Sequence, residues 1–325
     1  MALVDLASER LGGVVIAAND DFFAPKENLI KIEAPISVEG KFTNHGKWMD
    51  GWETRRRREP GHDWCIVRLG ARGLIKGIDV DTSFFRGNFP EACAMDACSL
   101  DGSRGIAELE QATWREILQP TRLDGDMHNR LDVRTSETAN HVRLRIFPDG
   151  GVARLRVYGE VVPDWNRLAA EGPVDLAGVL SGGVVVMASD MFFGSRQNLI
   201  MPGEARNMSE GWETRRRRGP GNDWTVIRLG TPGVIERALV STSHFKGNAP
   251  AACSIDACLD SDWQAAEWRE LLPRTPLQPD AEQAFTETIQ PIGPVRHVRF
   301  NIFPDGGVAR LRLFGTVEPS LRQES

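Results

Sequence analysis

Hydrophobic residues along this chain occur in short runs that are broken by glycine, proline and aspartate. A β-branched run occupies 12–18, another occupies 182–188, and each ends at polar turn residues, which predicts a short buried strand. The segments 63–70 and 223–230 are rich in hydrophobic residues and end in glycine, which predicts further strands. Strand signals at such short spacing favour an all-β protein.

The same pattern occurs twice, in the same order. The letters GWETRRRR stand at 51–58 and again at 211–218, and the motifs that follow keep their spacing without a gap as far as the paired cysteines. Two longer segments also recur, 12–23 as 182–193 and 141–159 as 297–315. The first copy carries about ten extra residues upstream of Gly51. Repeats of this length are whole folding units, so we predict two tandem antiparallel β-sandwich domains, at 1–165 and 166–325.

The closing segment of each copy predicts a β-hairpin. In the first copy, hydrophobic and polar residues alternate over 141–147 and 152–158, on either side of the letters Pro-Asp-Gly-Gly. Pairing around that turn opposes three pairs of side chains: Arg143 with Arg156, Arg145 with Arg154, and His141 with Tyr158. Directly opposed like charges destabilise a sheet. We therefore expect Arg143 and Arg156 to meet a carboxylate, either that of an acidic residue such as Glu53 or that of a substrate.

Two segments carry the only helical signals. Residues 104–118 and 262–272 share the letters Trp-Arg-Glu followed by two aliphatic residues, and proline comes soon after each. Because the residue before proline disfavours the helical conformation, we predict one short helix in each copy, ending there. Each helix is expected to cap the β domain without chemistry of its own.

Length and charge bound the class of protein. The 325 residues are 41% hydrophobic and 26% charged, as in ordinary globular domains. The formal net charge of −6 argues against a dedicated nucleic-acid or anionic-membrane surface. No apolar stretch approaches the roughly 18 residues of a membrane span, and Asp5 and Glu9 stand where a secretory signal would be positive. We expect a cytoplasmic protein with neither nucleic-acid nor membrane partners.

Five cysteines are too few for a disulfide scaffold, so reduced thiols are expected. Cys93 and Cys98 have the same spacing as Cys253 and Cys258, and small residues surround the first pair, which favours buried structural thiols. The spacing is also close to that of zinc ligands, although no histidine lies near enough in sequence to complete a set. No cofactor is evident, and a divalent metal stays open.

The GWETRRRR stretch is the main candidate for chemistry. If it is extended, Glu53, Arg55 and Arg57 share one face, and neither face is apolar, so the stretch must lie over a polar region or along an edge. Charged edge strands can also serve only to block aggregation. Four successive like charges repel one another, however, and a strand chosen for solubility would more often mix lysine with glutamate. We favour a functional role.

Two loops and an aspartate recur with this stretch. The letters Arg-Gly-Asn at 86–88 and Lys-Gly-Asn at 246–248 place a cation and an amide around a glycine that lets the backbone approach a ligand. The same letters are also common in simple turns. Asp20 and Asp190 follow the first strand of each copy, where aspartate often bonds its own backbone.

The combined motifs resemble the allantoicase family. The resemblance runs from about Gly12 to Gly315 and rests on GWETRRRR, Asp-Trp, Arg-Leu-Gly, the loop Phe-Arg-Gly-Asn-Phe-Pro and FPDGGVARLRVYG, each present in two versions. The strand pattern also resembles the galactose-binding-like jelly roll, whose ligands sit on loops at one end. The family implies a homo-oligomer of tandem jelly-roll repeats that hydrolyses allantoate to ureidoglycolate and urea. Among the positions where the second copy departs from the first are Asn301 for Arg145, His244 for Phe84, Asn222 for His62 and Ala251 for Glu91.

A site for allantoate needs a guanidinium fork for the carboxylate, acceptors for the ureido N–H groups, an acid for the departing urea and a base for water. Glu53 and Glu213 are the candidate acid or base, and His141 and His297 are the alternative base. The candidate substrate-binding residues are Arg55, Arg57, Arg86, Asn88, Arg143 and Arg156, with Arg215, Arg217, Lys246, Asn248, Arg299 and Arg312 in the second copy. No metal ligands are assigned.

Two other classes of function stay open. Jelly rolls of this type often only bind sugars or other small molecules, and an assay for urea release from allantoate would separate that class from a hydrolase. Nucleic-acid binding through the arginine run is opposed by the acidic net charge and the single tyrosine. The sequence contains no HExxH, GxSxG, P-loop or GxGxxG motif, so the enzyme classes that use them have no support.

Overall fold

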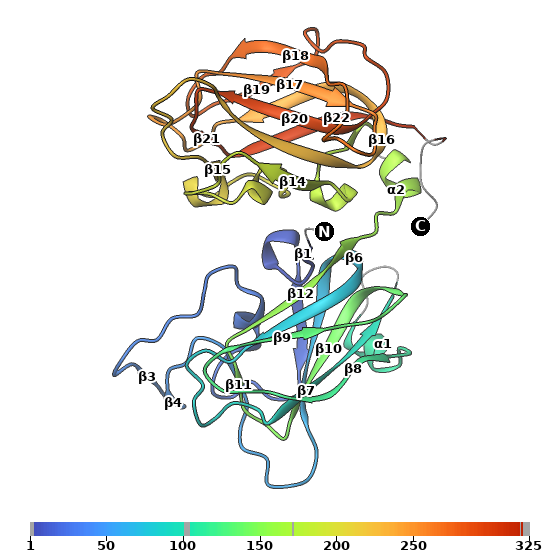
Figure 1. Cartoon of the computed structure of the whole chain (residues 1–325). Helices are drawn as coiled ribbons and strands as arrows, with labels where there is room; N and C mark the ends of the chain where they lie inside the picture. The colour runs from blue at the N-terminus through green and yellow to red at the C-terminus, as the bar shows by residue number, and fades with distance from the viewer. Residues whose placement is uncertain (1–2, 101–104, 171, 319, 321–325) are drawn as a thin grey trace. The chain divides into compact units, whose positions relative to one another are not determined.

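The computed structural model describes residues 3–100, 105–170, 172–318 and 320. The chain divides into two compact units, Leu3–Val162 and the part from Pro163 onward (Figure 1). Each unit contains one eight-stranded antiparallel sheet with the same strand order. The predicted all-β class with two tandem domains is therefore confirmed.

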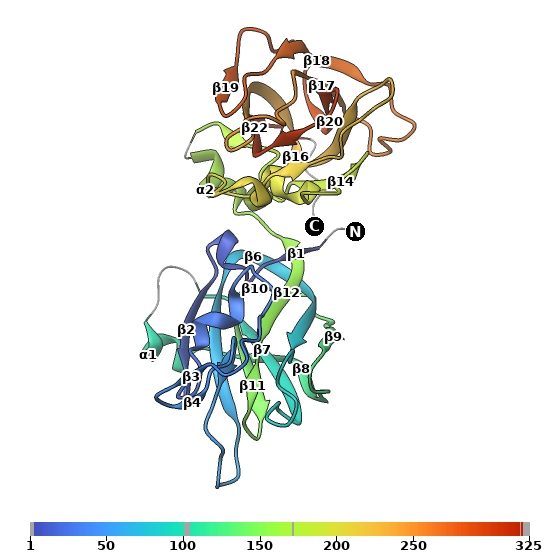
Figure 2. The same ribbon diagram turned by 90° about the vertical axis from the view of Figure 1, so that its left-hand side faces the viewer.

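The first unit is built around β6, a 19-residue strand that spans Asp63–Asp81. The first half of β6 pairs with β2 and β10, whereas its second half pairs mainly with β9 and β12 (Figure 2), so one strand serves both layers of the sandwich. The other elements are β1 Val4–Asp5, β2 Val14–Ala18, β3 Phe42–Thr43, β4 Gly46–Lys47, β5 Trp52–Glu53, β7 Ala92–Cys98, β8 Arg115–Arg122, β9 His128–Asp132, β10 Thr138–Phe147, β11 Gly151–Val152 and β12 Arg154–Val161, with η1 Glu9–Leu11, η2 Lys26–Ile30 and α1 Ile106–Glu110.

The second unit repeats this arrangement around β16, which spans Asp223–Ser241. Its strand order, β13-β22-β16-β20-β17-β18, matches β1-β12-β6-β10-β7-β8 of the first unit. The other bounds are α2 Trp165–Ala170, β13 Val174–Asp175, η3 Val179–Ser181, β14 Val184–Ala188, η4 Arg196–Ile200, η5 Met208–Glu210, β15 Trp212–Glu213, β17 Ala252–Cys258, β18 Arg269–Pro276, β19 Glu282–Phe285, β20 Val295–Phe303, β21 Gly307–Val308 and β22 Arg310–Val317.

The predicted hairpin at the end of each copy is wrong, although both of its strands exist. β10 and β12 pair with different halves of β6 rather than with each other. The turn at 148–151 leads into β11, which pairs with β5, so the chain crosses to other partners instead of folding back. Aspartates of β6 stand opposite the arginines of β12, Asp81 opposite Arg154 and Asp79 opposite Arg156. Alternation revealed the strands but carried no information on which strands they pair with.

The helix predictions are largely wrong. Within 104–118 the helix is only α1, and the shared Trp-Arg-Glu letters lead into β8, which pairs with β7. Within 262–272 the corresponding letters begin β18, and α2 lies instead near the start of the second unit. β8 and β18 are edge strands with many exposed residues. Their sequences therefore lack the strict alternation of a half-buried strand, and a helical pattern fits them equally well.

The core of each unit lies between the layers and is anchored by a tryptophan. Trp52 is fully buried, and its indole N–H donates a hydrogen bond of 2.8 Å to the backbone oxygen of Asp20. Trp212 is equally buried and donates to Asp190 at the same distance. A buried tryptophan with a satisfied N–H adds apolar burial without leaving an unpaired donor. This anchor fixes the start of the GWETRRRR segment against the loop that carries Asp20.

Asp5, on β1, carries a mostly buried carboxyl, with its side chain 18% exposed. It accepts hydrogen bonds from the N–H groups of Val157 (2.9 Å) and Ala7 (3.2 Å). Burial raises its pKa from 3.8 to about 6, with a smaller contribution from the negative charge of Asp79, although the two hydrogen bonds and Arg156 act in the opposite direction. Asp175, at the same place in the second unit, also has a pKa raised by burial.

We expect Asp5→Asn to weaken the pH dependence of stability. A carboxyl whose folded pKa of about 6 exceeds its unfolded value of 3.8 lowers the free energy of unfolding as pH rises between these values. The difference corresponds to roughly 3 kcal/mol. Urea unfolding of the first unit at about pH 4 and about pH 8 measures it, because asparagine keeps an acceptor but cannot ionise. The same pH effect in both proteins would contradict this assignment.

Candidate active site

The GWETRRRR segment is a strand only at its start. Glu53 pairs with Gly151 on one side and bridges to Ala24 on the other, whereas 54–58 are not in a strand. Thr54 is buried, and its backbone N–H donates to Gly150 at 3.1 Å. Because Trp52 and Thr54 both point inward, the intervening Glu53 points the other way, towards the loops.

Glu53 is held by the predicted Arg-Gly-Asn loop. The side-chain amide of Asn88 donates a 2.6 Å hydrogen bond to Glu53 Oε1, and Asn248 donates to Glu213 in the same way at 2.6 Å. Burial raises the pKa of Glu53, whereas the hydrogen bond from Asn88 and the charge of Lys47 act in the opposite direction. The structure thus brings together two predicted site residues in each unit, with the amide orienting the carboxylate.

Arg55 is held along one edge of its guanidinium. Its Nε donates to Asp20 Oδ2 at 2.6 Å, and the group lies 5.2 Å from the centre of the Phe22 ring. Its side chain is still 63% exposed, so the guanidinium stays accessible to a ligand. Partial burial raises the pKa of Asp20, but hydrogen bonds from the Phe22 N–H and from Arg55 outweigh that effect. The pKa of Asp20 therefore lies below its ordinary value. Asp20 therefore both forms a turn and positions a cation.

The second unit repeats this contact. Arg215 Nε donates to Asp190 Oδ1 at 2.9 Å, its Nη2 lies 2.8 Å from the same oxygen, and the guanidinium lies 5.3 Å from the centre of the Phe192 ring. Its side chain is 65% exposed. Both units therefore present a fixed but accessible guanidinium, the group that binds carboxylates in a bidentate manner.

Arg57 has an internal role. Its Nη1 donates to the buried Asp63 at 2.7 Å, and its backbone N–H donates to Asp149 Oδ2 at 2.8 Å. Asn19 also donates to the Asp63 carboxylate, at 2.7 Å. Arg217 makes the equivalent ion pair with Asp223. These arginines hold their loops in place, so the structure does not present them to a ligand as it does Arg55.

The other two arginines of each run are not among the predicted site residues. Arg56 and Arg58 are exposed, as are Arg216 and Arg218 in the second unit. Within the described part of the chain, none of the four has a recorded ion pair. Their charges add a positive potential around the loop, which favours anionic ligands.

The two candidate histidines lie away from Glu53 and Glu213. His141 is 3% exposed, stands opposite Arg68 and Cys98 in the sheet, and has Nδ1 2.7 Å from Asn140 Oδ1. It is five residues along β10 from Ile146, which pairs with Asp63 near the loop end, or roughly 17 Å at strand spacing. His297 occupies the same position on β20. Burial and nearby arginines lower the pKa of both rings.

Arg143 and Arg299 lie on the outside of their sheets. Arg143 pairs with Asp96 at 2.7 Å, and Arg299 pairs with Asp256 at 2.9 Å. The expected carboxylate partner is therefore present for Arg143, but it is Asp96 and not Glu53. Each of these two arginines is thus neutralised by an aspartate, and not by a residue of the predicted hairpin.

Arg156 also meets an acidic residue other than Glu53. Its guanidinium lies 3.7 Å from Asp5, and it donates to the backbone oxygen of Ile32 at 3.3 Å. Arg312 makes the corresponding 3.7 Å contact with Asp175 and donates to Gly203 at 2.9 Å. Both arginines are mostly buried, and neither is brought to the glutamates.

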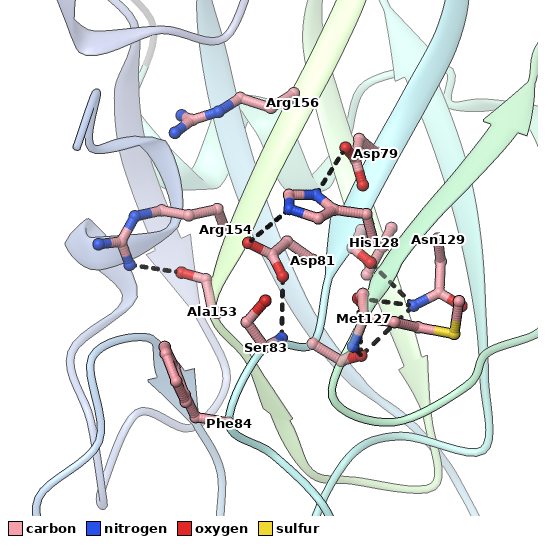
Figure 3. Close-up of polar contacts among 12 residues, drawn as sticks. Asp79, Asp81, Ser83, Phe84, Met127, His128, Asn129, Ala153, Arg154 and Arg156 are labelled. Carbon is pink, nitrogen blue, oxygen red and sulfur yellow. Dashed lines mark hydrogen bonds and ion pairs between the residues drawn. The ribbon is translucent and has the colours of Figure 1, made fainter. Parts of the chain in front are cut away.

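Beside Arg156 lies a polar cluster that the sequence did not single out (Figure 3). His128 Nδ1 lies 3.0 Å from the buried Asp79, and its Nε2 lies 3.9 Å from the buried Asp81. The sequence signal for this cluster was the alternation Asp79-Val80-Asp81 in β6. Because Val80 is in the core, the two aspartates lie on the other face of the strand. The aligned positions of the second unit hold Leu239 and Ser241, so this cluster belongs to the first unit alone.

The cations of the two loops are exposed and paired at the surface. Arg86 contacts Asp126 at 2.9 Å, and Lys246 contacts Asp280 at 3.7 Å, each with a side chain that is 80% exposed. Lys246 also lines an open surface depression of about 390 Å³ together with Asn207, Met208, Ser209 and His244. His244 takes the place of Phe84, and both adopt positive φ angles, 72° and 69°.

All five cysteines are buried and unpaired. Burial raises the pKa of both Cys93 and Cys253 to about 12, so these thiols stay protonated at neutral pH. Among the described residues, no group of three or more histidine, cysteine, aspartate or glutamate side chains is placed to hold a metal ion. The interpretation of the cysteines as structural thiols fits their surroundings.

Comparison with known proteins identifies the family. A family model described as the allantoicase repeat matches residues 4–162 and 174–318. "Probable allantoicase 1" of Burkholderia mallei is 47% identical over 97% of this chain and 95% of its own, and "Probable allantoicase" of Photobacterium profundum is 48% identical over 96% of each. The crystal structure of allantoicase from Saccharomyces cerevisiae superposes with a TM-score of 0.83 at 39% identity, covering 97% of this chain and 93% of that one. The chain therefore belongs to the allantoicase family.

Proposed function

We infer that the protein hydrolyses allantoate to ureidoglycolate and urea. The observation that carries this proposal is that each unit contains both an amide-held glutamate and an aspartate-held arginine, in a chain that matches the allantoicase repeat twice. In the reaction, the bond between the central carbon and one ureido nitrogen breaks. A water oxygen bonds to that carbon, and the departing urea nitrogen gains a proton. The substrate thus needs a cation for its carboxylate and a group that transfers protons.

Arg55 is our proposed carboxylate-binding residue, with Arg215 in the second unit. Asp20 occupies one edge of the Arg55 guanidinium, which leaves the terminal nitrogens to bind a planar anion. The Phe22 ring beside it restricts the side chain further. A guanidinium held on two sides loses less conformational entropy when it binds substrate.

Glu53 and Glu213 are our proposed proton-transfer groups. Asn88 occupies one oxygen of Glu53, and no hydrogen bond from the described residues holds the other, which can accept a proton from water or deliver one to the leaving urea. Glu53 and Arg55 are two residues apart, which corresponds to roughly 7 Å between Cα atoms where the backbone is extended. That separation suits a substrate whose carboxylate and ureido groups share one central carbon.

We also propose that the protein assembles as a homo-oligomer, as the resemblance implies, and works in the cytoplasm. A reducing compartment agrees with five buried, unpaired thiols. Among the described residues no helix is long and apolar enough to cross a membrane. Our mechanism assigns no step to a cofactor, and a divalent metal stays an open alternative.

The direct test is urea release from allantoate by the purified protein. We expect turnover that saturates with allantoate, with ureidoglycolate formed in equal amount. Binding of allantoate without any urea release would instead favour a non-catalytic binding module. Loss of binding when Arg55 and Arg215 are both replaced by methionine would identify the carboxylate contact in either case.

A further inference from the structure

The first unit carries a hairpin that the second unit lacks. The extra residues upstream of Gly51 fall in the segment 31–50, and they include the two short paired strands β3 and β4 (Figure 1). The corresponding segment of the second unit, 201–210, is about ten residues shorter and holds the helix η5 instead. The two candidate sites therefore differ in what surrounds them.

His45 fastens this hairpin to the candidate site. Its ring stacks on Phe22 with centroids 4.3 Å apart and planes 17° apart, and its Nδ1–H donates to the Phe22 backbone oxygen at 2.7 Å. Phe22 is the ring beside Arg55. The hairpin thus contacts the same aromatic ring as the proposed carboxylate-binding arginine.

The next two residues bring the hairpin towards Glu53. A side-chain carbon added at Gly46 would lie 4.0 Å from the Phe23 ring, and the Phe23 N–H donates to the Glu53 backbone oxygen at 3.2 Å. Lys47 follows Gly46, is exposed, and has no recorded ion pair within the described residues. Its charge acts on the Glu53 carboxyl, where it opposes the effect of burial.

The second unit shows the consequence of lacking the hairpin. Phe192, the counterpart of Phe22, is 65% exposed, compared with 42% for Phe22. Phe193 beside it is 62% exposed. No residue of the shorter segment stacks on Phe192 in the described structure. Phe192 is therefore more exposed than Phe22, and the cation of the shorter segment, Arg206, pairs with Glu210.

We propose that Lys47 is a substrate-binding residue of the first unit, held at its site by His45, and that the two units consequently bind the anionic ureido substrate with different affinities. This proposal rests on the proposed function. Lys47 and Arg55 provide two cations near Glu53, one for the substrate carboxylate and one for a ureido oxygen. In the second unit, Arg215 is the counterpart of Arg55, and the shorter segment holds no lysine.

The test is steady-state kinetics of Lys47→Gln in the full chain. The activity of the first site is the difference between the rate with Glu53 intact and the rate of the Glu53→Gln variant. We expect the KM of this first-site activity to rise about tenfold in Lys47→Gln, as for the loss of one charge-assisted hydrogen bond, with a smaller change in kcat. Lys41→Gln is the matched control, because Lys41 lies in the same hairpin but stacks 3.7 Å over Trp48.

The outcomes separate this proposal from the one on which it rests. An unchanged KM in Lys47→Gln, with Glu53→Gln still inactivating the first site, overturns the role of Lys47 alone. If Glu53→Gln removes no activity, the proposed function of the first unit fails, and the role of Lys47 fails with it. Equal effects of Lys47→Gln and Lys41→Gln would mean that only net charge or hairpin stability is involved, which also overturns the proposal.

His45 is a positioning residue in this scheme, and its contribution is separable. His45→Ala should raise the same KM, and adding it to Lys47→Gln should have little further effect, because both changes act through one contact. His45→Phe keeps the stacking on Phe22 and should recover part of the affinity. Independent, multiplying effects of the two changes would contradict a shared role.

Discussion

A chain that carries both Glu53→Gln and Glu213→Gln should turn over allantoate roughly 10²- to 10⁴-fold more slowly than the unchanged protein. Glutamine keeps the shape of the side chain and an oxygen that can accept the amide hydrogen bond from Asn88 or Asn248. It cannot take up or release a proton at neutral pH. The loss should therefore fall on kcat while the melting temperature stays close to its original value.

The two single variants assign the activity to the units. If both sites work, each single variant keeps the activity of the other site, whereas one inactive variant would mean that one unit is catalytic and the other structural. Glu39→Gln, an exposed carboxylate in the hairpin segment, is the matched control and should have normal kcat. Near-normal kcat in the double variant would remove these glutamates from the mechanism.

Arg154→Ala should lower the free energy of unfolding of the first unit by about 3 to 5 kcal/mol. The guanidinium is 2% exposed, donates to the backbone oxygens of Glu33 (2.9 Å), Asp50 (3.0 Å) and Ala153 (2.7 Å), and pairs with the Asp50 carboxylate at 2.8 Å. Its removal leaves these acceptors buried with fewer donors, which costs more than the loss of a surface ion pair.

Urea unfolding of the full chain, followed by circular dichroism, measures this loss. Arg310→Ala makes the same change in the second unit, where Arg310 donates to the backbone oxygen of Glu210 at 2.7 Å, and should destabilise that unit instead. Arg134→Ala, at an exposed position, should change stability by less than about 0.5 kcal/mol. A loss for Arg154→Ala no larger than that of Arg134→Ala would mean that the buried contacts contribute little.

The sequence predicted the repeats and most strands because these depend on local signals. Duplicated motifs revealed the two units, and β-branched runs bounded by turn residues marked strands such as β2 and β14. Strand pairing is not local, so the partners of β10 and β12 were misassigned. The edge strands β8 and β18 have many exposed residues, so their hydrophobic alternation is weak, and they were taken for helices.

The candidate site was predictable in part for the same reason. Alternation placed Glu53 and Arg55 on one face, and the Arg-Gly-Asn letters marked the loop that supplies Asn88. Which of four successive arginines is held by Asp20 and which by Asp63 depends on tertiary contacts. His141 was predicted as a base from its chemistry alone. Its distance from the loops depends on its position along β10, which is known only from the folded structure.

The pairing of β1 with β12 places the beginning and the end of the first unit on adjacent strands, Val4 opposite Gly159, and β13 with β22 does the same in the second, Val174 opposite Gly315. A domain whose ends meet can be copied head to tail by gene duplication, because each new copy starts where the last one stops. Only a short join is required, and no strand has to be exchanged. One copy can then differ from the other by an insertion, such as the hairpin of the first unit.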